Sequence, residues 1–245
     1  KGAYIIAPGG RNVLFEGEAY FLDRRKFDEF YIKQAEDAGA DVRFGIEVLN
    51  VLRSEGGFLL STSKGKIRCK LVIVSDGINS RISGLLGLKP IKYPDDIAWS
   101  LEAEIEAEGI GEPDYFEYYV GNHAPGWKST YSPCGGNRAT LGMYVRRHGM
   151  DVSDFFDDWL ERFKRIKGLD EVKIISKATG GDPIAAIPGD IVADGVMVVG
   201  GSAAQSGIGY GIHAGQICGD VAADAIAKGD TSKGFLSEYR KLWNE

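Results

Sequence analysis

The chain has 245 residues, of which 44% are hydrophobic and 26% are charged, and its formal net charge is −6. A chain of this length can bury a sizeable core, as one large domain or as two interleaved ones. The negative net charge argues against nucleic acid as a partner, because binding its phosphates requires a concentrated basic surface.

The cysteines and the apolar runs indicate the cellular setting. Cys69, Cys134 and Cys218 lie far apart without paired ligand spacing, which argues against a zinc site and against a disulfide scaffold. We expect each thiol to be a small, buried or half-buried hydrophobe. No apolar run approaches the roughly 20 residues that span a bilayer. We therefore expect a cytoplasmic protein with at most peripheral membrane contact and no metal.

The first predicted elements are short extended segments between residues 4 and 22, followed by a helix over residues 24–38. Asp23 is suited to cap the start of this helix, and Gly39 is suited to end it. Its aromatic and small residues fall on one face at helical spacing. These residues are Phe27, Phe30, Tyr31, Gln34, Ala35 and Ala38.

A strand at residues 41–44 and a β-meander are expected next, the meander with strands at 47–53, 57–61 and 65–69. An apolar strand at residues 71–75 then ends in Asp76-Gly77. Asp-Gly after a strand is commonly only a turn. A carboxylate at the carboxyl end of an internal strand is also where open α/β sheets contact ligands.

From residue 91 the pattern changes to alternating, aromatic-rich strands, as in a half-exposed antiparallel sheet. The expected strands cover residues 99–106, 115–120, 127–132, 139–146 and 171–178. A helix near 152–164 should cover this sheet with Phe155, Trp159, Leu160 and Phe163. The layout predicts a substrate domain inserted into a nucleotide-binding fold.

A short strand at residues 196–199 runs into a glycine-rich segment and then into a helix of small residues. Glycines let a ligand approach the backbone, and the start of a helix favours negative charge. The last segment, 234–243, has apolar residues at near-helical spacing. A helix that docks on its own domain is favoured there over a membrane-surface anchor.

Three of these segments, in this order, resemble the geranylgeranyl reductase family, within the para-hydroxybenzoate hydroxylase-like group of flavoproteins. The family carries an Arg-x-x-Phe-Asp helix start, a strand ending in Asp-Gly-x-x-Ser, and a late Gly-Asp-Ala-Ala…Gly-x-Gly-Ile segment. Here these motifs correspond to Arg24–Asp28, Asp76–Ser80 and Gly200–Ile212. The resemblance covers nearly the whole chain.

The resemblance implies an α/β fold, α+β overall: a partial FAD-binding Rossmann-like domain with an inserted antiparallel β-sheet substrate domain. We assign residues 1–90 to the middle part of the FAD-binding domain, 91–180 to the substrate domain, and 181–245 to the return to the FAD-binding domain with C-terminal helices. It also implies that the amides of Ile212 and His213 face the flavin. The implied cofactor-binding residues are Arg24, Asp76, Gly77, Gly201, Ser202, Gly207, Gly209, Gly211, Ile212 and His213.

An aromatic segment around Trp127, Tyr131 and Pro133 resembles the strand pair that lines an isoprenoid tunnel in this family. A core sheet packed with aromatic residues is the alternative. No catalytic side chain can be assigned.

The sequence departs from the family in two ways. No Gly-x-Gly-x-x-Gly turn is present near the start, so we expect a fragment or a missing first segment. Gly201 or Ser202 stands where the family has an acidic residue that bonds the ribityl chain, and the loop to Gly211 is shorter and lacks the usual proline.

The implied function is an FAD-dependent oxidoreductase that reduces the isoprenoid double bonds of lipids, with NAD(P)H or ferredoxin as electron donor. Two alternatives stay open. One is a flavin-dependent aromatic monooxygenase of the same fold, and the other is a non-catalytic hydrophobic-ligand-binding module that has lost flavin.

Overall fold

The structure is a computed structural model that describes residues 1–18, 20–146, 151–184 and 188–245. The chain divides into two compact units, of which the first combines residues 1–42 with 98–181, and the second combines 43–97 with 182–245. Residues 1–42 thus cluster with the antiparallel sheet, because β1 (Gly2–Ile6) adds to that sheet by pairing with β8 (Tyr115–Tyr119). The assignment of residues 1–90 to a single functional domain stays a prediction.

The first unit is built on a seven-stranded sheet in the order β11-β7-β10-β9-β8-β1-β2. Besides β1 and β8, its strands are β2 (Asn12–Glu16), β7 (Ile97–Glu106), β9 (Lys128–Pro133), β10 (Arg138–Val145) and β11 (Lys173–Pro183). The antiparallel pairing of β7, β10, β9 and β8 confirms the predicted sheet. β11 begins two residues later than expected and extends further.

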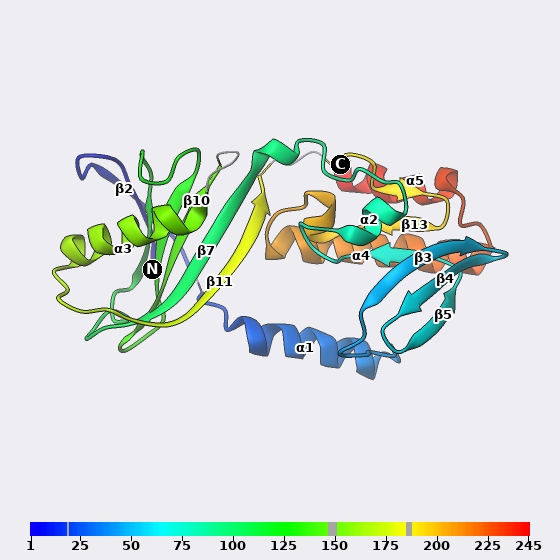
Figure 1. Ribbon diagram of the computed structural model, residues 1–245, viewed down its shortest axis with the longest axis horizontal. Coiled ribbons are helices and arrows are strands. Elements are labelled where there is room, and N and C mark those ends of the chain that lie inside the picture. Colours follow the sequence, from blue (N-terminus) through cyan, green and yellow to red (C-terminus); the bar gives the residue numbers. More distant parts are fainter. Residues whose placement is uncertain (19, 147–150, 185–187) are drawn as a thin grey trace. The chain divides into compact units, whose positions relative to one another are not determined.

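One face of this sheet is covered by α3 (Val152–Lys167), as Figure 1 shows. Asp151 caps its start by accepting from the Ser153 amide, and Gly168 ends it in the left-handed region at φ 67°. Its side chains Phe156, Trp159 and Phe163 are fully buried. The expected Phe155 and Leu160 are half-buried and pack against the same core, and Phe156, three residues before Trp159 on the same helical face, adds to it.

The first unit also contains α1 (Arg24–Asp37), which confirms the predicted helix and its caps. The Asp23 carboxylate accepts from the Lys26 amide at 3.2 Å, and Gly39 has φ +96°. No residue of α1 is buried, so its apolar face is exposed in this chain.

The second unit contains two three-stranded sheets. The meander of β3 (Val48–Ser54), β4 (Gly57–Thr62) and β5 (Gly65–Cys69) confirms the prediction. The expected strand at 41–44 is wrong: the chain there has no sheet pairing in the described residues and turns at Gly45, with φ +64°.

The other sheet has the order β12-β13-β6, with β12 (Val192–Ala193), β13 (Val196–Val198) and β6 (Val72–Val74). In Figure 1 the two long helices of this unit, α4 (Ile208–Lys228) and α5 (Lys233–Asn244), lie beside this sheet. Leu236 and Tyr239 of α5 are fully buried in its core, which confirms the predicted docking of the last helix. Three short helices complete the unit: α2 (Arg81–Leu85), η1 (Pro94–Asp96) and η2 (Gly200–Ala203).

The burial of the cysteines gives a first testable prediction. All three thiols are free, and burial raises the pKa of Cys134 to about 11 and that of Cys218 to about 12. A raised pKa leaves less thiolate at a given pH, and the thiolate is the reactive form. At pH 8 we expect iodoacetamide to modify both at least about 100-fold more slowly than an unperturbed thiol of pKa about 8.5, as measured by mass spectrometry. The denatured protein is the control and should react at all three positions.

Candidate functional site

The Asp-Gly turn and the late glycine segment lie at the same edge of one sheet. β6 and β13 pair in parallel, with Val72 opposite Val196 and Val74 opposite Val198. The turn that contains Asp76 follows β6, and η2 follows β13. Parallel strands end at a common edge, so the pairing brings two segments together that are more than 120 residues apart in sequence.

The Asp76 carboxylate joins these two segments directly. Its Oδ1 accepts from the Ser202 hydroxyl at 3.2 Å, and its Oδ2 accepts from the Ile82 amide at 3.1 Å. Gly201 packs against the Gly77–Ile78 backbone, since a Cβ added at Gly201 would lie 3.6 Å from the Ile78 nitrogen. The structure therefore brings together the predicted residues Asp76, Gly77, Gly201 and Ser202.

The turn between β13 and α4 is held by a side chain that the sequence analysis missed. Gln205 is only 2% exposed, and its Oε1 accepts from the Gly200 amide at 2.7 Å. Its Nε2 donates to the hydroxyl oxygen of Tyr239 at 2.8 Å, and that hydroxyl donates to the Val198 carbonyl at 3.0 Å. The turn is thus tied to α5. Only the polar character of Gln205 between small residues could have indicated this role.

The same turn contains an unusual backbone conformation. Ala204 has φ +58°, and it is the only residue other than glycine with positive φ in the described part of the chain. The left-handed region costs an L-residue roughly 1–2 kcal/mol. Ala204 is also 1% exposed, so the surrounding packing holds this conformation in place.

The start of α4 presents free backbone amides. Gly207 precedes the helix with φ +94°, and the start has neither a side-chain cap nor an acidic residue in its first turn. Gly211 donates to the Gly207 carbonyl at 3.0 Å, so the intrahelical bonds begin there. The amides of residues 208–210 precede that first bond and have no partner among the described residues. A 21-residue helix with an open start favours an anionic ligand group.

The predicted glycines leave room for such a ligand. A Cβ added at Gly207, Gly209 or Gly211 would have no heavy atom within 4 Å. The role of the Ile212 and His213 amides toward a cofactor stays a prediction. Both lie beyond the first turn of α4, where an amide donates to the carbonyl four residues earlier and is not free. The free amides lie in the preceding turn.

The structure places the other predicted cofactor residue, Arg24, in the first unit. Arg24 is the first residue of α1 and forms a 3.2 Å ion pair with Asp28, one turn further along the helix. Its side chain is 60% exposed. Its role toward a cofactor stays a prediction.

The predicted substrate residues lie on or near β9 in the first unit. Tyr131 is fully buried on the face covered by α3, where its ring lies 5.3 Å from that of Phe163 and its hydroxyl donates to the Ile110 carbonyl. This position favours the core-packing alternative for Tyr131. Trp127 is 38% exposed, and Pro133 is half-buried, so both keep accessible surface.

The opposite face of this sheet carries both aromatic and polar side chains. Tyr118 lies opposite Thr130 in the register, and the Lys128 ammonium lies over the rings of Tyr118 and Tyr144. Gly142 lies between Glu102 of β7 and Thr130 of β9 in the register of the sheet. A Cβ added at Gly142 would lie 2.4 Å from the Thr130 hydroxyl, so the Thr130 side chain points to this face. The Tyr144 hydroxyl donates to Glu102 on the same face. Aromatic side chains therefore lie on both faces of the sheet, with Tyr131 and the aromatic residues of α3 on the core side.

Among the helices of the described residues, none combines the length and the apolar composition that a membrane crossing requires. Within the same residues, no group of three or more His, Cys, Asp or Glu side chains is arranged to hold a metal ion.

Comparison with known proteins identifies the class. No protein-family model matches the chain. The solved structure of a geranylgeranyl bacteriochlorophyll reductase-like protein from Thermoplasma acidophilum superposes with a TM-score of 0.89 at 27% identity, and covers 99% of this chain and 66% of that one. The flavin-dependent halogenase CmlS has a TM-score of 0.73 at 16% identity, with 99% of this chain and 49% of that one covered, which shows the fold alone. The fold is that of FAD-dependent, Rossmann-type flavoproteins.

Curated relatives narrow the class to a family. The digeranylgeranylglycerophospholipid reductase of Methanothrix thermoacetophila is 32% identical over 267 residues, covering 100% of this chain and 66% of the relative. Reductase 2 of Methanococcoides burtonii is 31% identical over 264 residues, covering 99% and 64%. The chain spans about two thirds of the length of these relatives. It belongs to the geranylgeranyl reductase family.

The Gln205 network should be essential to the stability of the site. Replacing Gln205 with Leu leaves the half-buried Gly200 amide without its acceptor and removes the donor to the Tyr239 hydroxyl, which keeps only its bond to the Val198 carbonyl. We expect a loss of about 1–3 kcal/mol in the free energy of unfolding, measured by urea denaturation. Gln216→Leu, at an exposed position of α4, is the matched control and should stay within about 0.5 kcal/mol of the wild type. Equal effects of the two substitutions would contradict the assigned role.

The neighbouring alanines of the turn allow a test of the strained backbone. Ala204→Gly should stabilise the protein by up to about 1 kcal/mol, because glycine adopts positive φ without the Cβ clash. Ala203→Gly, one residue earlier in η2 and equally buried, has no such strain to relieve. It should destabilise by about 0.5–1 kcal/mol. Thermal unfolding of the two variants gives the comparison, and the same sign for both would refute the interpretation.

Proposed function

We propose that this protein is an FAD-dependent oxidoreductase that reduces the isoprenoid double bonds of a lipid. The observation that carries the proposal is the convergence of the Asp76–Ser202 contact and the open start of α4 in one unit. The names of the relatives, which are digeranylgeranylglycerophospholipid reductases, support the substrate class.

The residues of this site fit a flavin. Three glycines leave the approach to α4 open, and the free amides of residues 208–210 favour negative charge on a ligand. Asp76 can accept hydrogen bonds from ligand hydroxyls while it holds the turn at Ser202. The acidic residue that the family has at position 201 or 202 is absent, and Asp76 is the carboxylate at that point of this site.

Reduced FAD, when bound, supplies a hydride to one carbon of the double bond, and the other carbon takes a proton. The residues of this chain bind and orient the cofactor at the sheet edge and stabilise negative charge through the start of α4. We infer that the electrons come from NAD(P)H or a ferredoxin. The substrate is a hydrophobic lipid, with Trp127 and Pro133 as proposed contacts, and contact with a membrane is at most peripheral.

The alternative functions have less support. The halogenases that share the fold are 12–16% identical to this chain, whereas the first three relatives, all named reductases, are 29–32% identical. An aromatic monooxygenase and a binding module without flavin are therefore not favoured.

The proposal predicts flavin binding that depends on Asp76. The purified protein should take up FAD and become yellow, and reduced anaerobically it should saturate a geranylgeranyl phospholipid. Asp76→Asn removes the charge but keeps the shape, and should weaken FAD binding about tenfold or more, because hydrogen bonds to charged groups contribute about 1.5–3 kcal/mol. Equilibrium dialysis followed by visible absorbance measures the affinity.

Asp224→Asn is the matched control, since Asp224 lies on the exposed side of α4 and its side chain is 71% exposed. It should leave FAD affinity unchanged. A protein that stays colourless after incubation with FAD would end the proposal.

A further inference from the structure

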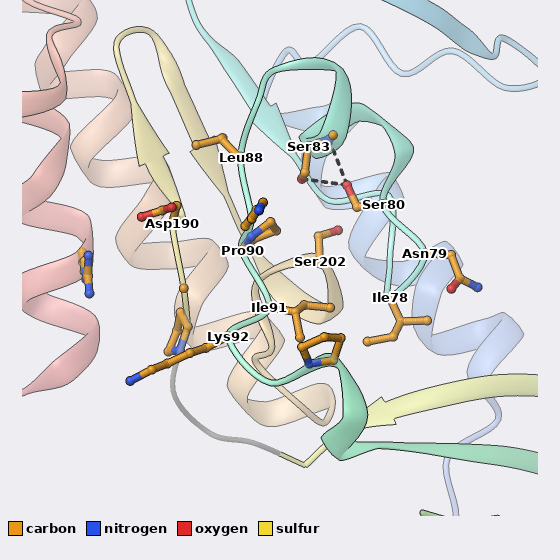
Figure 2. A pocket seen from close by; sticks show the side chains of 16 residues that line it. Ile78, Asn79, Ser80, Ser83, Leu88, Pro90, Ile91, Lys92, Asp190 and Ser202 are labelled. Carbon is orange, nitrogen blue, oxygen red and sulfur yellow. Dashed lines mark hydrogen bonds between the residues drawn. The ribbon is translucent and has the colours of Figure 1, made fainter. Parts of the chain in front are cut away.

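A second feature of the same unit is a cavity beyond the Asp76–Ser202 contact. Its volume is about 740 Å³, within the range of small-ligand sites. The loop of residues 78–80 and α2 form one side, and the segments 88–92 and 188–190 form the other. Figure 2 shows Ile78 and Asn79 across the cavity from Asp190, with Ser202 between them.

Backbone hydrogen bonds join the two segments that form one wall of this cavity. The Gly189 amide donates to the Pro90 carbonyl at 2.6 Å, and the Asp190 amide donates to the Lys89 carbonyl at 2.9 Å. Ile91 and Pro188 form an antiparallel bridge beside these bonds. A Cβ at position 189 would lie 2.3 Å from the Lys89 carbonyl oxygen, so only glycine allows the two segments to approach this closely. The wall is thus formed before any ligand binds.

The charges that line the cavity are mainly positive. Lys89 and Lys92 lie on the wall, and Arg240 of α5 faces the same space, against the single carboxylate of Asp190. None of the three cations forms an ion pair with another described residue. The chain as a whole carries a net charge of −6, so three cations with one carboxylate form a local exception. Leu88, Pro90 and Ile91 add apolar surface beside them.

We propose that this cavity binds a ligand with a phosphate or pyrophosphate group, which the cations of Lys89, Lys92 and Arg240 neutralise while the apolar wall contacts the rest of the ligand. A nucleotide and the head group of a phospholipid share this chemistry. The proposal goes beyond the proposed function, because Lys89, Lys92 and Arg240 have no part in that function and the site does not require that flavin binds. The cavity adjoins the proposed flavin site, since Ser202 also lines it.

The first test uses inorganic pyrophosphate and isothermal titration calorimetry on the purified protein. We expect a dissociation constant of about 1 mM or tighter at low salt, weakening as salt is added. Lys89→Gln, Lys92→Gln and Arg240→Gln should each weaken binding about fivefold, the effect of one unit charge a few ångströms from the ligand. Asp190→Asn should strengthen binding by a similar factor, because it removes the repelling carboxylate.

Lys64→Gln is the matched control, since Lys64 lies in the turn between β4 and β5 and does not line the cavity. It should leave pyrophosphate binding unchanged. Thermal unfolding checks that each exposed charge variant is folded. Absence of binding at about 10 mM pyrophosphate would overturn the proposal, and so would variants at 89, 92 and 240 that behave like the Lys64 control.

Two further probes identify the source of the phosphate. Tighter binding of adenosine 2′,5′-bisphosphate than of glycerol phosphate indicates a nucleotide, and the reverse order indicates a lipid head group; either order supports the site. Competition between FAD and pyrophosphate would assign these cations to the flavin and would overturn a separate site. A colourless protein that still binds pyrophosphate would contradict only the proposed function, so the two failures are distinguishable.

Discussion

The parallel pairing of β6 with β13 is the constraint on which the site depends. It places the end of each strand at one edge and lets the Asp76 carboxylate accept from the Ser202 hydroxyl. A shift of one residue in this register would turn Asp76 toward the other face of the sheet, because side chains alternate along a strand. Buried Val72, Val74, Val196 and Val198 hold the register through the core. Hydrophobic packing therefore determines the geometry of a polar site.

The turn of residues 200–205 has a well-defined conformation although its sequence departs from the family pattern. The segment 200–205 lacks the usual acidic residue, yet it is ordered by the buried amide of Gln205 and by the left-handed Ala204. Each of these groups is unfavourable alone, one as a buried polar group and the other as a strained backbone. Both are compensated by the packing of α4 and α5 around the turn.

Much of this architecture could be predicted from local patterns. The caps of α1, the meander and the antiparallel sheet follow from turn residues and alternating hydrophobicity, which act over a few positions. The convergence of Asp76 and Ser202 was expected only through the family resemblance. The strand expected at 41–44 fails because the chain turns at Gly45, and the burial of Tyr131 agrees with the core-sheet alternative that the sequence left open. The bond between Gln205 and Tyr239 depends on a distant contact and could not be predicted. A single residue carries no signal for a partner that is 34 positions away.

The Tyr239 hydroxyl makes the site sensitive to truncation of the chain. This residue belongs to α5, near the carboxyl end of the chain, and it supports the turn at the sheet edge from behind. A stop codon just before α5 would remove none of the residues proposed to bind the flavin, although it would remove Arg240 of the proposed phosphate cavity. It would also remove the Tyr239 hydroxyl that supports the turn, so a truncation outside the proposed flavin-binding segments would weaken flavin binding.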